Sequence, residues 1–161
     1  MTTDVRDRLA TVVAITVTPF DDSGALDVDA YVKVVARMAG AGITAITPNG
    51  NTSEFYSLSD EEAAACVDAT FSAVSDEVLV VPGVGHDVAR AVKMAQYAEG
   101  AGAPAVMVHQ PVHPFKSVEG WVDFHRAIAD AVPDLGLVAY VRDPLFTADA
   151  LAALAEAVPT L

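Results

Sequence analysis

Two stretches decide the fold: GAGITAIT at residues 40–47 and GAGAPAVMV at residues 100–108. In each, Gly-Ala-Gly is followed by an apolar run. Glycine ends a helix readily because it tolerates the positive φ that follows the last helical turn. The recurrence therefore predicts a repeated unit in which an α-helix ends at the glycines and a β-strand follows.

Five apolar runs of this kind alternate with helical patterns along the chain. They are almost continuously apolar, which is typical of strands that are covered on both faces of a parallel sheet. The alternation predicts an α/β fold, and both an open doubly wound sheet and a barrel fit it. The predicted strands are Val12–Thr18, Ile43–Thr47, Val78–Val81, Ala105–Val108 and Leu137–Val141.

Amphipathic helices are expected between the strands, because apolar residues recur there at helical spacing. Ser59 and Glu62 have the spacing of a capping box. Ser117 and Thr147 are expected N-caps of the last two helices. The clearest apolar stripes are Tyr31, Val34, Val35 and Met38, then Trp121, Phe124 and Ile128, then Leu151, Leu154 and Val158.

Composition bounds the class of protein. The 161 residues are 53% hydrophobic and 19% charged, which predicts a folded domain with a core. The net charge of −13 repels phosphate backbones and anionic lipids, so we expect neither nucleic acid nor membrane as a partner. The run Val12–Val17 is too short to span a bilayer, and no targeting segment is evident. Cys66, the single cysteine, is expected to be a small buried hydrophobe in a cytoplasmic protein.

The loop after the second predicted strand is dense in small polar residues, from Pro48 to Glu54. In parallel β/α folds the active residues gather at the carboxyl ends of the strands. Gly50 permits a tight turn, so Asn51, Thr52 and Ser53 can aim amides and hydroxyls at one point and bind a carboxylate. The alternative is an ordinary surface loop whose side chains bond their own backbone.

The loops after the third and fourth strands give no cofactor signal. Residues 82–86 (PGVGH) lack the third glycine of a dinucleotide fingerprint. His109 and His113 have a spacing that metal ligands use, but the nearby prolines disfavour a helix and no acidic ligand is close. We therefore expect no metal or other cofactor, and we interpret the histidines as neutral polar residues at a pocket mouth.

Tyr140 and Arg142 follow the fifth strand. A phenol at a strand end is a candidate proton carrier because its hydroxyl both donates and accepts. It is equally well interpreted as a barrel-core ring with a bonded hydroxyl. Arg142 could clamp a second substrate carboxylate, or it could pair with Asp143.

The ordered set of motifs resembles the dihydrodipicolinate synthase/N-acetylneuraminate lyase family over essentially the whole chain. The motifs are Thr18-Pro19-Phe20, Gly50–Glu54, Pro82–Gly85 and Tyr140. The resemblance implies a (β/α)₈ TIM barrel, which takes about 250 residues. Residues 1–161 would then be the N-terminal portion of one barrel domain, with about five β/α units, interrupted before strand six.

The family implies a lyase that acts on pyruvate or a related 2-keto acid through a lysine Schiff base. That lysine would lie on strand six, beyond Leu161, since Lys33, Lys93 and Lys116 fall on helices or a loop. The family implies that the substrate is this small-molecule keto acid. It also implies that the full-length protein is a homo-oligomer, either a dimer or a tetramer. By the same match, Tyr140 and Thr52 are expected to be catalytic, and Gly50, Asn51, Thr52, Ser53, His113 and Arg142 to bind substrate.

Departures from the family pattern leave alternatives open. Asn51 and Ser53 stand where the synthases carry threonine and glycine, and His113 stands where they place a relay tyrosine. Residues 54–58 (EFYSL) and the Arg142-Asp143 pair are closer to the related 5-dehydro-4-deoxyglucarate dehydratases. A non-catalytic half-barrel for binding or assembly, and a different α/β enzyme with similar loops, are the other hypotheses. A half-barrel alone would expose strand edges, so we expect it to associate.

Overall fold

The computed structural model describes residues 1–112 and 116–161, so the predicted site residue His113 lies outside the described residues. The strands are β1 (Val13–Ile15), β2 (Ala45–Thr47), β3 (Leu79–Val80), β4 (Gly83–Val84), β5 (Ala105–Val108) and β6 (Gly136–Ala139). The helices are α1 (Thr3–Arg8), α2 (Val28–Gly40), η1 (a 3-10 turn, Asn51–Ser53), α3 (Asp60–Ala73), α4 (Val88–Gly100), α5 (Val118–Ala131) and α6 (Ala148–Ala157).

Every strand pairs parallel with its neighbours, in the orders β1-β2-β3 and β4-β5-β6. The six labelled strands occupy five positions, because β3 and β4 are two parts of one extended segment. Pro82 interrupts that segment because it has no amide proton to donate. On either side of it, Val81 N donates to Ile46 O at 2.9 Å and Gly83 N donates to Pro48 O at 2.8 Å. The predicted parallel α/β architecture is confirmed.

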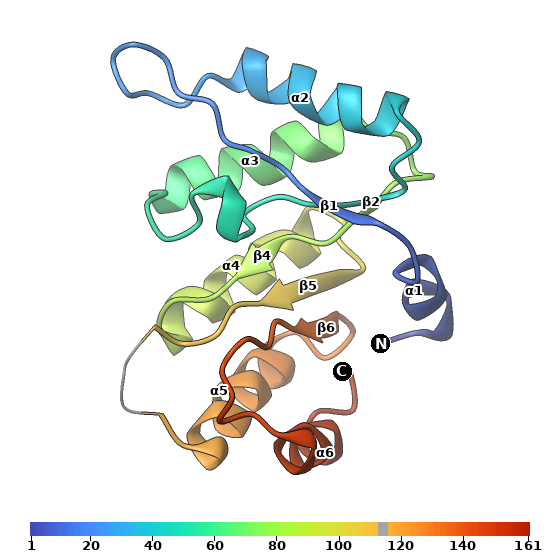
Figure 1. Ribbon diagram of the computed structural model, residues 1–161, viewed down its shortest axis with the longest axis vertical. Helices are drawn as coiled ribbons and strands as arrows, with labels where there is room; N and C mark the ends of the chain where they lie inside the picture. Colours follow the sequence, from blue (N-terminus) through green and yellow to red (C-terminus); the bar gives the residue numbers. More distant parts are fainter. Residues whose placement is uncertain (113–115) are drawn as a thin grey trace.

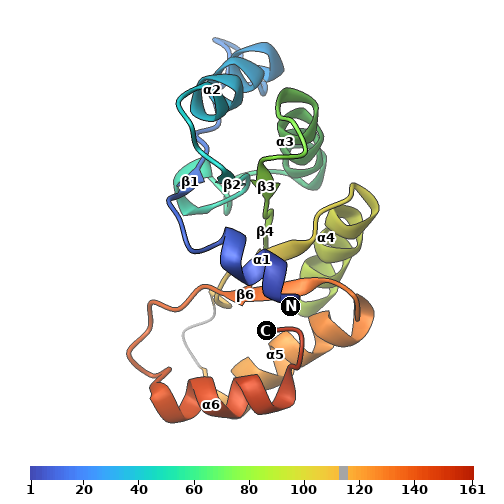
Figure 2. The same cartoon turned by 90° about the vertical axis from the view of Figure 1, so that its right-hand side faces the viewer.

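The sheet is curved, with helices on its outer side. Figure 1 shows the strands running side by side, and Figure 2 shows α2 to α6 in an arc around them. The outer core lies between these helices and the sheet, and Val106, Leu137 and Ile128 are fully buried in it. On the inner side, α1 lies across the strands and Val5 packs on Leu79. The chain is thus a partial barrel with an outer helical layer.

The chain ends beside its own beginning. Arg6 Nη2 donates to Leu161 O at 3.3 Å, and both termini meet at the same place in Figure 1. After α6, the chain returns to the outer edge of β6, where Leu137 N donates to Thr160 O at 2.8 Å. Residue 160 therefore occupies the position beside the amino end of β6 at which a further parallel strand would start.

The predicted helix ends and most of the predicted buried faces are confirmed. Ser59 caps α3 through the Glu62 amide, and Glu62 bonds back to Ser59 N. Ser117 and Thr147 cap α5 and α6. Leu151 is an exception, since it is 39% exposed while Leu154 is buried.

Three expectations about local structure need correction. The regular strands are shorter than predicted, because the ladder of β1 ends at Ile15 and that of β6 ends at Ala139. The polar N-terminal residues form α1, which was not predicted, and Gly83–Val84 adds the short strand β4. Within the described residues, no helix combines the length and the apolarity needed to cross a membrane.

Cys66 is 1% exposed on α3, and burial raises the pKa of its thiol to about 11. A thiol with a raised pKa is protonated at neutral pH and is a poor nucleophile. The prediction that Cys66 is a buried apolar residue is confirmed.

Candidate active site

The predicted carboxylate-binding loop forms a compact turn at the carboxyl end of β2. Two residues other than glycine flank it in the left-handed region, Asn49 at φ 59° and Glu54 at φ 60°. Such backbone conformations are uncommon and are kept where the surroundings enforce them. Between them, the 3-10 turn η1 presents Asn51 and Thr52 at the end of the sheet. Within the described residues, no group accepts a hydrogen bond from the Asn51 or Thr52 amide.

Ser53 holds this turn from below. Its hydroxyl donates to Thr16 O at 2.6 Å and accepts from Gly50 N at 3.2 Å, and its amide donates to Gly50 O at 2.9 Å. The side chain is completely buried. Both donors of Ser53 are engaged by the protein, so the structure shows Ser53 as a support of the turn, and its expected contact with substrate stays a prediction.

A buried network of hydroxyls supports Ser53 from β1 and the outer helices. Thr16 Oγ1 lies 3.0 Å from Ser53 Oγ, and Tyr31 OH donates to Thr16 Oγ1 at 3.1 Å. Thr18 Oγ1 donates to Ser53 O at 2.8 Å. Burial raises the pKa of Tyr31 to about 12, so this phenol remains a neutral hydrogen-bonding group. Thr16 and Tyr31 carry no motif, and sequence reasoning missed both.

The turn meets the end of β6. Asn51 Nδ2 donates to Tyr140 OH at 3.0 Å, although 89 residues separate the two. Tyr140 is half-buried and Thr52 is exposed beside it in the turn. An amide N–H occupies an acceptor site on the phenol oxygen, so the proton of Tyr140 stays available for another partner. The structure therefore brings the turn that carries Gly50, Asn51, Thr52 and Ser53 into contact with Tyr140, through Asn51.

His109 lies beneath this junction. It follows β5, is completely buried, and places Nε2 2.8 Å from Asn49 O. Its ring stacks on Phe55 with a centroid distance of 4.0 Å and meets the Tyr140 ring edge-on at 5.7 Å. Burial lowers the pKa of His109, against the raising effect of the bond to Asn49. The expectation that His109 lines a pocket mouth is wrong, since the ring lies inside the protein.

Arg142 is exposed, and Asp143, the residue with which it could have paired, forms an ion pair with Lys116 instead. Asp143 pairs with Lys116 at 2.5 Å, and this contact is the main cause that lowers the pKa of Asp143. Burial raises the pKa of the Tyr56 phenol, Tyr140 raises it further, and the charge of Arg142 opposes both. Arg142 therefore acts electrostatically on the Tyr56 phenol.

No lysine among the described residues forms a hydrogen bond with Tyr140. Lys33 and Lys93 are exposed on α2 and α4, on the outer layer of the fold, and Lys116 is held by Asp143. The described residues also contain no group of three histidine, cysteine or acidic side chains that could hold a metal ion. The chemistry that these residues offer is carboxylate binding and proton transfer.

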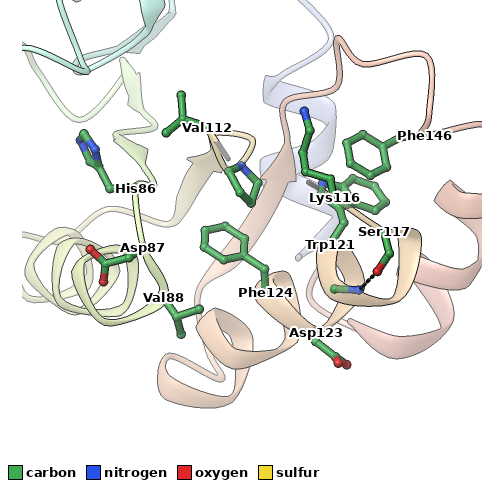
Figure 3. A pocket seen from close by; sticks show the side chains of 12 residues that line it. His86, Asp87, Val88, Val112, Lys116, Ser117, Trp121, Asp123, Phe124 and Phe146 are labelled. Atoms are coloured by element: carbon green, nitrogen blue, oxygen red, sulfur yellow. Dashed lines mark hydrogen bonds between the residues drawn. The ribbon is translucent and has the colours of Figure 1, made fainter. Parts of the chain in front are cut away.

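A cavity of about 870 Å³ lies elsewhere, between the amino ends of α4 and α5 (Figure 3). Trp121 and Phe124 supply apolar walls, and His86 and Asp87 face them from the α4 side. Trp121 stacks on Phe146 at a centroid distance of 4.2 Å. Neither Thr52 nor Tyr140 lines this cavity, so its size does not make it the site of the predicted chemistry.

The chain belongs to the Dihydrodipicolinate synthetase family, whose pattern matches residues 8–156. It is 37% identical over 141 residues to the "Probable 5-dehydro-4-deoxyglucarate dehydratase 1" of Streptomyces coelicolor, covering 87% of this chain and 44% of that protein. It is also 37% identical over 117 residues to the 4-hydroxy-tetrahydrodipicolinate synthase of Bartonella quintana, covering 72% and 40% respectively.

Solved structures agree. The crystal structure of dihydrodipicolinate synthase from Bacillus clausii superposes with a TM-score of 0.88 at 39% identity, over 92% of this chain and 50% of that one. The chain therefore has the fold of part of a TIM-barrel lyase, and it spans about half the length of the relatives it matches.

Proposed function

We propose that this chain supplies the carboxylate-binding turn and the proton-carrying tyrosine of a lyase that acts on pyruvate or a related 2-keto acid. The amides of Asn51 and Thr52 and the Thr52 hydroxyl bind the keto acid's carboxylate. Tyr140 transfers protons to and from the carbonyl oxygen of the keto acid and the enamine. A lysine Schiff base, with the lysine beyond residue 161, provides the electron sink for the bond that is made or broken.

The hydrogen bond between Asn51 and Tyr140 carries this proposal. It joins the turn after β2 to the end of β6, so a ligand held by the turn lies within reach of the phenol. Positioned proton transfer of this kind contributes about 10²–10⁴-fold to a rate. A binding module needs the turn but gives no reason for a phenol whose proton is left available beside it.

The path of the chain supports the placement of the lysine. Thr160 already bonds to Leu137 at the outer edge of β6. A strand that continued from this point would run parallel beside β6 and end next to Tyr140.

Asn51 and the relative from Streptomyces coelicolor favour a second candidate, a sugar-acid dehydratase that uses the same imine chemistry. Asn51 replaces the hydroxyl that a threonine would place against Tyr140, and its amide N–H donates to the phenol oxygen but does not pass a proton on as a hydroxyl does. A relay through this residue is therefore closed, which fits a reaction other than the synthase condensation. We also propose a cytoplasmic, homo-oligomeric full-length protein, on the family resemblance alone.

Borohydride trapping tests the proposal. The polypeptide that continues past residue 161 is incubated with pyruvate and sodium borohydride and then mapped by mass spectrometry. We expect one adduct, on a lysine beyond residue 161, and none on Lys33, Lys93 or Lys116. Residues 1–161 alone should gain no adduct. An adduct within residues 1–161, or none in the longer chain with any 2-keto acid, would contradict the proposal.

Turnover distinguishes the two candidates. The dehydratase candidate predicts loss of water from 5-dehydro-4-deoxyglucarate and no condensation of pyruvate with an aldehyde. The synthase candidate predicts the reverse. Both candidates share the trapping result, so the two measurements answer separate questions.

A further inference from the structure

We propose that His109 is a positioning residue that holds the carboxylate-binding turn through the carbonyl of Asn49 and links that turn to Tyr140. This inference rests on the proposed function for its effect on the keto acid. The contact itself is a property of the fold that is measured without any ligand. No motif in the sequence assigned His109 this role.

The hydrogen bond fixes the tautomer of His109. A carbonyl oxygen can only accept, so the 2.8 Å contact with Asn49 O requires the proton on Nε2. Nδ1 is then an unprotonated acceptor, and it is buried without a partner among the described residues. A second proton on this ring would place a buried N–H against no acceptor, so the neutral form is the one that fits.

The carbonyl that accepts the hydrogen bond from His109 belongs to Asn49, the residue at which the turn begins. Asn49 is only 2% exposed and has φ 59°, the left-handed conformation from which Gly50 and η1 continue. Its side chain is also tied down, because Nδ2 donates to Ala63 O at 3.0 Å. The Asn49 side chain is thus held by α3, while the peptide that follows Asn49 is held by His109 at its carbonyl and by Ser53 Oγ at the Gly50 amide. Its orientation sets where the amides of Asn51 and Thr52 point.

Two glycines make room for this contact. A Cβ at Gly83 would lie 2.1 Å from Asn49 O and 2.7 Å from His109 Nε2. A Cβ at Gly85 would lie 3.0 Å from the His109 Cβ and 3.2 Å from the Phe55 ring. Any side chain at Gly83 would force the two bonded groups apart. Gly83 is therefore explained by the close approach of His109 to Asn49, and Gly85 by the close packing of His109 and Phe55.

The His109 ring lies between the turn and Tyr140 and contacts both sides. One face of His109 stacks on Phe55, which lies two residues after the end of η1, and the Tyr140 ring meets the His109 ring edge-on. Both neighbours come from elements that carry predicted site residues. A side chain that lacked the donor, or that had a different shape, would loosen the turn and Tyr140 together.

The test compares two substitutions in the polypeptide that continues past residue 161. His109→Leu removes the donor, whereas His109→Gln keeps an N–H near the position of Nε2. We expect His109→Leu to raise the pyruvate concentration for half-maximal borohydride trapping by about tenfold, the scale of one lost hydrogen bond to a buried carbonyl. We expect His109→Gln to stay within about threefold of the natural protein. The trapping rate at saturating pyruvate should change less than the half-saturation value in both.

His125 provides a matched control. It is equally buried, and its Nδ1 lies 2.8 Å from the carbonyl oxygen of Trp121 on α5, away from the turn. His125→Leu should lower the unfolding free energy as His109→Leu does, yet leave the half-saturation value unchanged. An equal rise in half-saturation for both leucine variants would show a general loss of stability and overturn the proposal.

Two measurements without keto acid separate this proposal from the proposed function. Long-range ¹H–¹⁵N spectra of the histidine rings should show the Nε2–H tautomer for His109. Amide hydrogen exchange of Gly50 and Ser53 should quicken in His109→Leu and not in His125→Leu. An Nδ1–H tautomer, or unchanged exchange, overturns the positioning role even if trapping succeeds. If trapping fails in the natural protein while both signals appear, the keto-acid function fails and the contact stands.

Discussion

The side-chain amide of Asn51 donates to the hydroxyl oxygen of Tyr140 at 3.0 Å, and this bond joins the turn after β2 to the carboxyl end of β6. A hydroxyl at position 51 could donate or accept, and protons could pass through it in either direction. The amide N–H only donates, so it fixes Tyr140 as the acceptor and directs the phenolic proton elsewhere. The bond therefore defines where a ligand must lie to exchange a proton with Tyr140.

Ser53 is predicted to matter for the shape of the turn and for stability. Ser53→Ala would leave Gly50 N and Thr16 O without their side-chain partner in a completely buried place. We expect a loss of about 1–3 kcal/mol in the free energy of unfolding, measured by urea denaturation. Ser57→Ala is the control, because Ser57 is exposed and its hydroxyl makes no hydrogen bond among the described residues. Equal stability of the two variants would refute the supporting role of Ser53.

Gly50 is predicted to tolerate no side chain. A Cβ at this position would lie 2.4 Å from Ile15 Cγ2, on the strand beneath the turn. Gly50→Ala must displace Ile15 or the turn, and we expect a loss of about 1–3 kcal/mol. Gly40→Ala is the matched control, since nothing lies within 4 Å of its added Cβ at the end of α2. That control should be neutral or stabilising by up to about 1 kcal/mol. Equal melting temperatures for the two variants would contradict the close approach.

The pH dependence of stability should reflect the buried histidines. Burial lowers the pKa of both His109 and His125, so the unfolded chain takes up protons before the folded one as the pH falls. The free energy of unfolding should therefore decline below about pH 6.5, the ordinary histidine value, until the folded state is also protonated. Asp87 and Asp143 have lowered pKa values and affect stability only in more acidic solution, below about pH 4.

Denaturant titrations at pH 8, 6.5 and 5.5 measure this effect. The double variant His109→Gln/His125→Gln has no titratable imidazole at the two buried positions. Its free energy of unfolding should therefore change less between pH 8 and 5.5 than that of the natural protein. An identical decline in the double variant would place the effect elsewhere.

The general layout could be predicted from the sequence because it depends on repeated local patterns. Gly-Ala-Gly followed by an apolar run recurs at residues 40–47 and 100–108, and it marks helix ends and parallel strands. The carboxyl ends of parallel strands share one edge of the sheet, so the polar loop after β2 and Tyr140 had to lie on the same side. That topology does not by itself predict their direct contact, which the structure shows as the hydrogen bond between Asn51 and Tyr140.

The support beneath the site could not be predicted in the same way. Thr16, Tyr31 and His109 act through hydrogen bonds whose partners are far away in the sequence. The apolar stripe predicts that the Tyr31 ring is buried, but it does not show the partner of the Tyr31 hydroxyl. The helix α1 was missed because it is six residues long, and among its side chains that the structure describes Val5 alone is buried, which gives no amphipathic pattern. The break between β3 and β4 had a signal in Pro82, which cannot donate to the ladder.

A double-mutant cycle on Asn51 and Tyr140 tests the central claim that the turn and the phenol serve one ligand. Its readout is kcat of the continuing polypeptide with the 2-keto acid that it turns over. We predict that Tyr140→Phe lowers kcat by about 10²–10⁴-fold and Asn51→Ala by a smaller factor. In the Tyr140→Phe background, Asn51→Ala should have almost no further effect on kcat, because the effects of substituting two residues that act through one another are not additive. Independent, multiplicative losses, or full activity of Tyr140→Phe, would contradict the account.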